Sequence, residues 1–268
     1  MVVLLALLIV PLILVGDQSF RLFTPGYAGA RPGAPFTFQN YAELLTPAYG
    51  RYFFDTFRIG AEASIAALIV SFPIAYRVAR EDRGALRRLW IGFLIAMLFL
   101  SILVRVYAID LAFGPSGFGR SLAALLGVGL NSRSYAEVTI ILALIHSLIP
   151  LATLSLIGPL QNLNPHFIEA AEALGAPRWR AHATITIPLS TRGLLAAFML
   201  CFTFCISAFV IPMILGKGRI LFVSNLVFSR FGEVANYPGG AAMAILVLAI
   251  SLCVVYLVTR LSQARWES

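Results

Sequence analysis

The chain has 268 residues, of which 60% are apolar and only 12% are charged, and its mean hydropathy is +0.89. These values exclude an ordinary soluble domain and indicate an integral membrane protein in contact with a lipid bilayer. The net charge of +8 does not indicate a nucleic-acid partner, because there is no basic stripe with interleaved aromatic residues. The arginines gather instead at the ends of apolar runs, where such side chains reach lipid headgroups.

Several apolar runs are close to the length of a membrane span, which is about 20 residues for about 30 Å of hydrocarbon. Five such runs are present, at 59–79, 89–112, 136–158, 193–215 and 240–259. The sequence therefore predicts an all-α integral membrane protein.

A sixth, shorter apolar run covers residues 1–15. Two interpretations are open: a first span whose start lies too far downstream, or a secretory signal segment. No Lys or Arg precedes Arg21, and a signal segment usually begins with a basic region. We therefore expect an uncleaved first span and about six transmembrane helices in all.

Five arginines crowd the short segment 77–90 and three more lie at 159–192, whereas the cations of the other segments, including Arg21, Arg31, Arg51, Arg120 and Lys217, are spread over considerably more of the chain. High cation density in short loops favours the cytoplasmic side of a membrane. With six spans, this places both segments, the tail after Arg260 and both termini in the cytoplasm.

Residues 165–190 form the one long polar interruption between apolar runs. Asn164 is a candidate N-cap, Pro165 suits the first helical position, and Gly175 suits a left-handed turn that ends the helix. Pro177 can open a second short helix, and Pro188 is expected to start the next span. One face of the first helix carries Phe167, Ala171 and Leu174, and another carries Glu169 and Glu172.

This segment resembles the cytoplasmic coupling loop, or EAA loop, of permease subunits of binding-protein-dependent ABC importers. The matching residues are Glu169, Ala170, Ala171, Gly175, Ile185 and Pro188, with Ile187 where the motif usually has leucine. Four further segments resemble the spermidine/putrescine-type branch: 40–45, 72–76, 103–108 and 208–212. The resemblance covers nearly all of the chain after about residue 36.

The resemblance implies a type I ABC importer permease in a bacterial inner membrane: one transmembrane domain over 1–268, with the coupling loop at 159–192. Such a subunit moves a small solute by alternating access. The implied partners are ABC ATPase subunits, a second permease subunit, with a heterodimer favoured over a homodimer, and a periplasmic or surface-tethered solute-binding protein. ATPase coupling would involve Glu169, Ala170, Ala171, Leu174, Gly175, Ile185 and Pro188.

The chain has no GxxxxGK[ST] motif, so it offers no recognisable nucleotide site of its own. We expect no catalytic residue, metal or cofactor in this chain, with ATP and magnesium bound by the partner ATPase. The solute suggested by the resemblance is a polyamine-like organic cation. Candidate residues for its path are Glu62, Tyr107 and Asp110, since ionisable groups at membrane depth are costly and Tyr107 offers a cation–π face. A plainer interpretation is that these charges are solvated or paired at the interface.

Two other classes of protein are alternatives to the importer. A proton-coupled secondary carrier could use Glu62 and Asp110, but it does not account for the EAA pattern. A membrane-embedded serine hydrolase could use Ser116, within Gly114-Pro115-Ser116-Gly117, and His146. That segment is more typical of a turn at the end of a span, and His146 has a simpler role as a hydrogen-bonding residue between helices.

Overall fold

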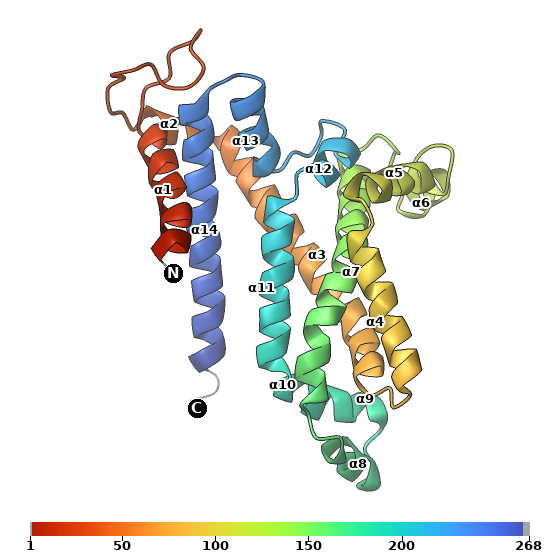
Figure 1. Ribbon diagram of the computed structural model, residues 1–268. Coiled ribbons are helices and arrows are strands. Elements are labelled where there is room, and N and C mark those ends of the chain that lie inside the picture. The colour runs from red at the N-terminus through yellow and green to blue at the C-terminus, as the bar shows by residue number, and fades with distance from the viewer. Residues whose placement is uncertain (1, 265–268) are drawn as a thin grey trace. The chain divides into compact units, whose positions relative to one another are not determined.

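Helices make up almost all of the regular structure in the computed structural model, which describes residues 2–264 (Figure 1). Within that range there is no β-strand, only two isolated bridges, which pair Arg21 with Phe36 and Phe23 with Ala30. The prediction of an all-α protein is confirmed. The chain divides into two compact units, a terminal unit of residues 1–58 and 206–268 and a central unit of residues 59–205.

The terminal unit is organised around its last helix. It contains α1 (Val2–Ser19), α2 (Gln39–Leu44), the first part of α3 (Pro47–Ala79), α12 (Val210–Leu215), α13 (Val223–Gly232) and α14 (Tyr237–Ala264). Helices α1, α2 and α13 pack against α14, and Figure 1 shows α1 and α14 side by side. Its buried core is made of Leu44, Phe53, Val223, Ala242 and Met243.

Side-chain hydrogen bonds stabilise the terminal unit, both at the segment between α1 and α2 and between α3 and α13. The side-chain amide of Asn40 donates to the carbonyl oxygens of Ser19 and Arg21, at 2.9 Å each. Thr56, on α3, accepts a hydrogen bond from the Val223 amide at 3.0 Å. These bonds satisfy buried polar groups that would otherwise destabilise the fold.

The central unit is built around α7 (Arg133–Gln161). It also contains the rest of α3, α4 (Gly84–Phe99), α5 (Ile102–Phe113), α6 (Gly119–Leu125), α8 (His166–Ala173), α9 (Arg178–Ala181), the π-helical turn η1 (His182–Thr186), α10 (Ile187–Leu189) and most of α11 (Thr191–Ser207). Both α4 and α5 pack on α7. The core joins α3, α4, α7 and α11 through Ala75, Val78, Leu94, Leu156, Ile157, Leu160 and Ala197.

Three helices are long and apolar enough to cross a membrane: Pro47–Ala79, Arg133–Gln161 and Tyr237–Arg260. They confirm the predicted spans at 59–79, 136–158 and 240–259. If each of the two bent helix pairs counts as one span, the described residues contain up to five candidate spans. Ile9–Ser19 is a shorter apolar helix. The sixth run is therefore helical, while its role as a span stays a prediction.

Two predicted spans are wrong as continuous helices. The run 89–112 is divided between α4 and α5, which meet at 88° because Leu100 and Ser101 have extended backbone, with ψ of 129° and 132°. The run 193–215 is divided where α11 ends at Ser207 and α12 begins at Val210. The prediction of one domain over 1–268 stays a prediction.

Candidate functional site

The first half of the predicted coupling loop folds as local capping rules require. The side-chain oxygen of Asn164 accepts a hydrogen bond from the His166 amide at 3.0 Å, and Pro165 already has helical angles. A cap of this kind stabilises a helix by about 1 kcal/mol. Helix α8 ends at Ala173, and Gly175 has a φ of +86°, which confirms its predicted left-handed conformation.

No residue of α8 is buried within the chain. Helix α8 contacts α9 and η1, but Phe167 is 52% exposed and the adjoining Leu174 is 89% exposed, so most of the predicted apolar face is open to solvent. Figure 1 shows α8 beyond the end of α7. An exposed amphipathic helix between two membrane helices is typical of a surface that binds another protein.

The carboxylates of α8 are held by local ion pairs. Glu169 lies 2.8 Å from Nδ1 of His166, and both side chains are largely exposed. Glu172 accepts a hydrogen bond from Nε of Arg178 at 3.1 Å, across the turn that contains Gly175. Between Glu169 and Glu172, the side chains of Ala170 and Ala171 are only methyl groups. Exposed pairs of this kind contribute little stability, so α8 can exchange them for other partners.

The second half of the loop differs from the prediction. Pro177 does precede a helix, α9, but Pro188 does not start the next span. It lies inside α10, which continues from η1 and ends at Leu189, and α11 begins at Thr191 after a 75° bend. The π-helical turn, which contains Ile185, immediately precedes α10. The hydroxyl of Thr191 donates to the Pro188 carbonyl at 2.6 Å and so satisfies an acceptor at the bend.

The predicted solute-path residues come from two helices. Glu62 is an exposed residue of α3, whereas Tyr107, 60% exposed, and Asp110, half-buried, lie on α5. Helix α5 is fixed to α7 by the Tyr135 hydroxyl, which donates to the Phe113 carbonyl at 2.5 Å. Because α5 bends away from α4, Tyr107 and Asp110 do not lie along the straight span 89–112 that the sequence predicted, whereas Glu62 lies in α3, within the predicted span 59–79. Their role in a solute path stays a prediction.

The glycine-rich segment after α5 is a tight turn, which favours the simpler interpretation of Ser116. A β-carbon on Gly117 would lie 2.2 Å from the Ala112 carbonyl oxygen, and one on Gly119 would lie 2.1 Å from that of Phe113. Both glycines are therefore required by close backbone packing. Ser116 is exposed within this turn.

Arg105 is a residue of interest whose environment the sequence did not predict. It lies on α5, is only 5% exposed, and acts electrostatically on His146 of α7. Among the described residues, neither Nε nor Nη2 of Arg105 has a hydrogen-bond partner, and neither has Nδ1 of His146. Nε and Nη2 form one edge of the guanidinium, the edge that binds a carboxylate with two parallel hydrogen bonds.

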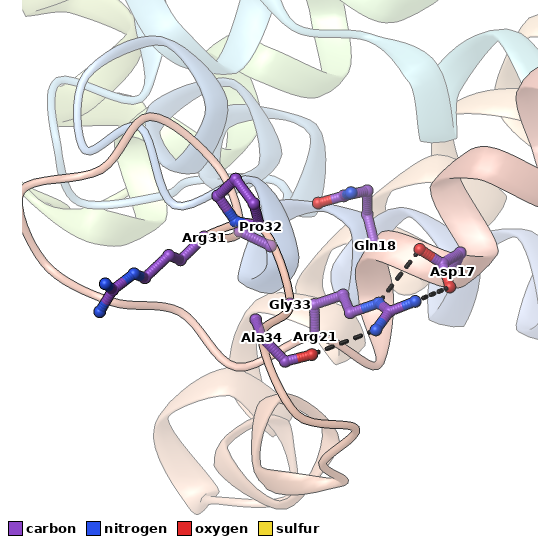
Figure 2. A pocket seen from close by; sticks show the side chains of 8 residues that line it. Asp17, Gln18, Arg21, Arg31, Pro32, Gly33 and Ala34 are labelled. Atoms are coloured by element: carbon purple, nitrogen blue, oxygen red, sulfur yellow. Dashed lines mark hydrogen bonds and ion pairs between the residues drawn. The ribbon is translucent and has the colours of Figure 1, made fainter.

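A hollow of about 410 Å³ lies in the terminal unit beside the end of α1 (Figure 2). Arg21 donates to both carboxylate oxygens of Asp17, at 2.8 and 3.2 Å, and to the Ala34 carbonyl at 3.1 Å. The hydrogen bond with Asp17 raises the pKa of the Arg21 guanidinium. Figure 2 shows Arg31 pointing away from this cluster. Arg21 is thus engaged in holding the segment after α1, which makes the hollow part of the structural framework.

The chain is similar to membrane components of importers. The family model described as "Binding-protein-dependent transport system inner membrane component" matches residues 67–267. The spermidine/putrescine transport system permease protein PotB of Haemophilus influenzae is 25% identical over 240 residues, which cover 87% of this chain and 83% of that protein. PotB of Escherichia coli is 25% identical over 238 residues, covering 87% and 86%.

A solved structure is similar in fold. It is the crystal structure of a bacterial ABC transporter involved in the import of the acidic polysaccharide alginate, with a TM-score of 0.72. At 14% identity the match covers 98% of this chain and 92% of that one. A second structure of the bacterial alginate ABC transporter, in complex with a periplasmic protein that holds an alginate pentasaccharide, matches with the same TM-score. At this identity the likeness concerns the fold.

Proposed function

The chain belongs to the family of binding-protein-dependent transport system inner membrane components, and from this premise we propose that it is a permease subunit driven by a separate ATPase. The observation that carries the proposal is α8, a helix with no buried residue and with an exposed apolar face. The chain has no recognisable nucleotide-binding motif of its own, so any ATP-driven work must come from a partner.

In this proposal α8 docks in a cleft on the ATPase. Phe167 and Leu174 supply apolar contacts, Ala170 and Ala171 allow close approach, and Gly175 sets the turn. Glu169 leaves its exposed pair with His166 and pairs with a basic residue of the ATPase. The rest of the motif, Ile185 and Pro188, lies in η1 and α10 and shapes the return to the membrane.

ATP binding closes the ATPase dimer and moves the docked loop with it. Helices α7 and α11, which flank the loop, then tilt and switch the solute path from inward-open to outward-open. We place ATP and magnesium in the ATPase and both termini in the cytoplasm. We propose that the two structural units belong to one permease domain, completed by a second, related permease subunit.

For the solute we propose a polyamine-like organic cation, because the PotB relatives are described as spermidine/putrescine permeases. Glu62, Tyr107 and Asp110 would line an outward-facing path with negative charge and an aromatic face. A solute-binding protein would deliver the solute. The alginate transporter of the same fold binds a periplasmic protein, which supports this part of the proposal.

The test is the variant Glu169→Lys, in a tagged chain purified from its native membrane in mild detergent. Loss of one partner of a hydrogen-bonded interface ion pair costs about 2–5 kcal/mol, so the ATPase should be lost from the purified sample and putrescine uptake should fall. Glu233→Lys is the matched control, because it makes the same charge change at an exposed residue of the terminal unit.

Normal ATPase recovery and normal uptake by Glu169→Lys would contradict the docking role. Recovery of the chain alone, from wild type as well as variant, would instead favour a proton-coupled carrier that uses Glu62 and Asp110.

A further inference from the structure

The C-terminal end of α3 is attached to the coupling loop at two separate places. Arg80 donates a hydrogen bond from Nη2 to the Leu163 carbonyl at 2.6 Å, just before α8. The Tyr76 ring meets the His182 ring edge to face, with centroids 4.6 Å apart, just after α9. The loop is therefore tied to one helix end both before and after the exposed α8.

These contacts form a continuous cluster within the central unit. The Arg80 guanidinium carbon lies 5.7 Å from the centre of the Tyr76 ring, within cation–π range. Nδ1 of His182 lies 3.0 Å from the hydroxyl of Thr186, which is 1% exposed. We call Tyr76, Arg80, Leu163, His182 and Thr186 the α3 clamp.

The clamp contrasts with α8 in its packing. Helix α8 has no buried residue, whereas the clamp contains buried Thr186 and adjoins Ala181, which is fully buried. A force applied to α8 by a partner therefore reaches the rest of the chain through the two ends of the loop. One route is the covalent one, into α7 and α11. The clamp adds a second route, into α3.

Helix α3 leads away from the clamp through the central unit. Its residues 59–79 belong to that unit, contain Pro73 and correspond to about 32 Å at 1.5 Å per residue. Its end near the clamp is packed through Ala75 and Val78 in the core of the central unit. Its beginning, which contains Phe53, belongs to the terminal unit.

We propose that Tyr76 and Arg80 are positioning residues that transmit the movement of the docked coupling loop to α3. They do not form the docking surface, which is α8. The inference rests on the proposed function, because it requires a partner that moves the loop. It adds that transport is coupled to ATP through α3 as well as through the two helices that flank the loop.

The test compares ATPase binding with transport in the complete complex. Tyr76→Leu removes the aromatic contact, and Arg80→Met removes the hydrogen bond but keeps an unbranched side chain. Tyr76→Phe and Arg80→Lys are the controls, since they keep the ring and a cationic donor. We expect the ATPase to co-purify with both disrupting variants and to hydrolyse ATP in these complexes at the wild-type rate. Putrescine taken up per ATP hydrolysed should fall about 5-fold or more, as expected for a lost coupling contact, and the controls should retain most of it.

Unchanged uptake per ATP in both disrupting variants would overturn the proposal, and so would loss of the ATPase, which would make the clamp part of the docking surface. If the disrupting variants do not reach the membrane, Thr186→Val serves instead. It is isosteric and removes only the hydroxyl beside His182, so the same uncoupling in weaker form supports the proposal and normal coupling overturns it. A wild-type chain that brings down no ATPase, or supports no putrescine uptake, refutes the proposed function and this inference with it.

Discussion

At the scale of single residues, the least expected feature is the buried guanidinium of Arg105, in which two nitrogens have no acceptor within residues 2–264. A charged group removed from water destabilises a protein unless hydrogen bonds or an opposite charge offset the lost hydration. Nε and Nη2 of Arg105 are buried and have no hydrogen-bond partner among the described residues. Because burial of this group is costly to stability, we expect Arg105 to have a role in transport.

The variant Arg105→Met separates the effect of the buried charge on stability from the expected role of Arg105 in transport. Replacing a buried charge by an apolar side chain of similar length is often neutral or stabilising by about 1–4 kcal/mol. We therefore expect the melting temperature of the purified complex to stay the same or rise, while uptake falls. Thermal unfolding in detergent, followed by uptake in the same preparation, checks both. A lower melting temperature would mean that the guanidinium is paired in the native complex.

At the scale of elements, the coupling loop is framed by a very close approach of two helices. A β-carbon on Gly193, near the start of α11, would lie 2.5 Å from Cβ of Pro159 and 2.7 Å from its Cγ, near the end of α7. The proline ring is rigid, so relief would require the backbone to shift. This contact fixes the separation of the two stems of the loop.

We expect Gly193→Ala to destabilise the chain by about 1–3 kcal/mol, the usual effect of overpacking. Gly158→Ala is a matched control, because it lies in the adjoining turn of α7 and its β-carbon would meet nothing within 4 Å. Alanine has the higher helix propensity, so the control should be neutral or slightly stabilising. Thermal unfolding of both variants measures the difference, and equal melting temperatures would show that the helices can move apart without loss.

Elements governed by local chemistry were the ones that the sequence predicted. Asn164 and Gly175 act on the backbone close to them in the chain, so the start and end of α8 can be predicted from the amino-acid sequence alone. The break between α4 and α5 falls at Leu100 and Ser101, where no glycine or proline marks it, and the predicted continuous span was wrong there. The prediction that Pro188 starts the next span is wrong for a related reason: α10 follows a π-helical turn and continues past Pro188, so that the bend falls at Ser190.

Contacts that depend on tertiary packing gave no signal in the sequence. Tyr76 and Arg80 lie at the end of an apolar run, where they are indistinguishable from ordinary interfacial residues. Their partners, Leu163 and His182, are far away in the chain, and one of them contributes only a backbone carbonyl. The burial of Arg105 likewise depends on the angle at which α5 leaves α4, which the sequence did not predict.

At the scale of the whole molecule, orientation follows from the number of membrane crossings between two points of the chain. The segment between α1 and α2 is separated from the coupling loop by α3, the bent pair of α4 and α5, and α7. If the bent pair crosses once, the number is three and the two segments lie on opposite sides of the membrane. The arginines at 77–90 and 159–192 favour the cytoplasm for the coupling loop. We therefore place the segment between α1 and α2 outside.

Cysteine labelling with a membrane-impermeant maleimide tests this arrangement. Ala28→Cys and Ala173→Cys are matched substitutions at exposed alanines, in a chain whose exposed Cys253 is replaced by serine. We expect Ala28→Cys to be labelled in intact spheroplasts and Ala173→Cys only after lysis. The reverse pattern would invert the orientation and remove the coupling loop from any cytoplasmic ATPase. Labelling of both sites from the same side would mean an even number of crossings, with α4 and α5 entering and leaving on one side as a re-entrant pair, as their 88° bend also allows.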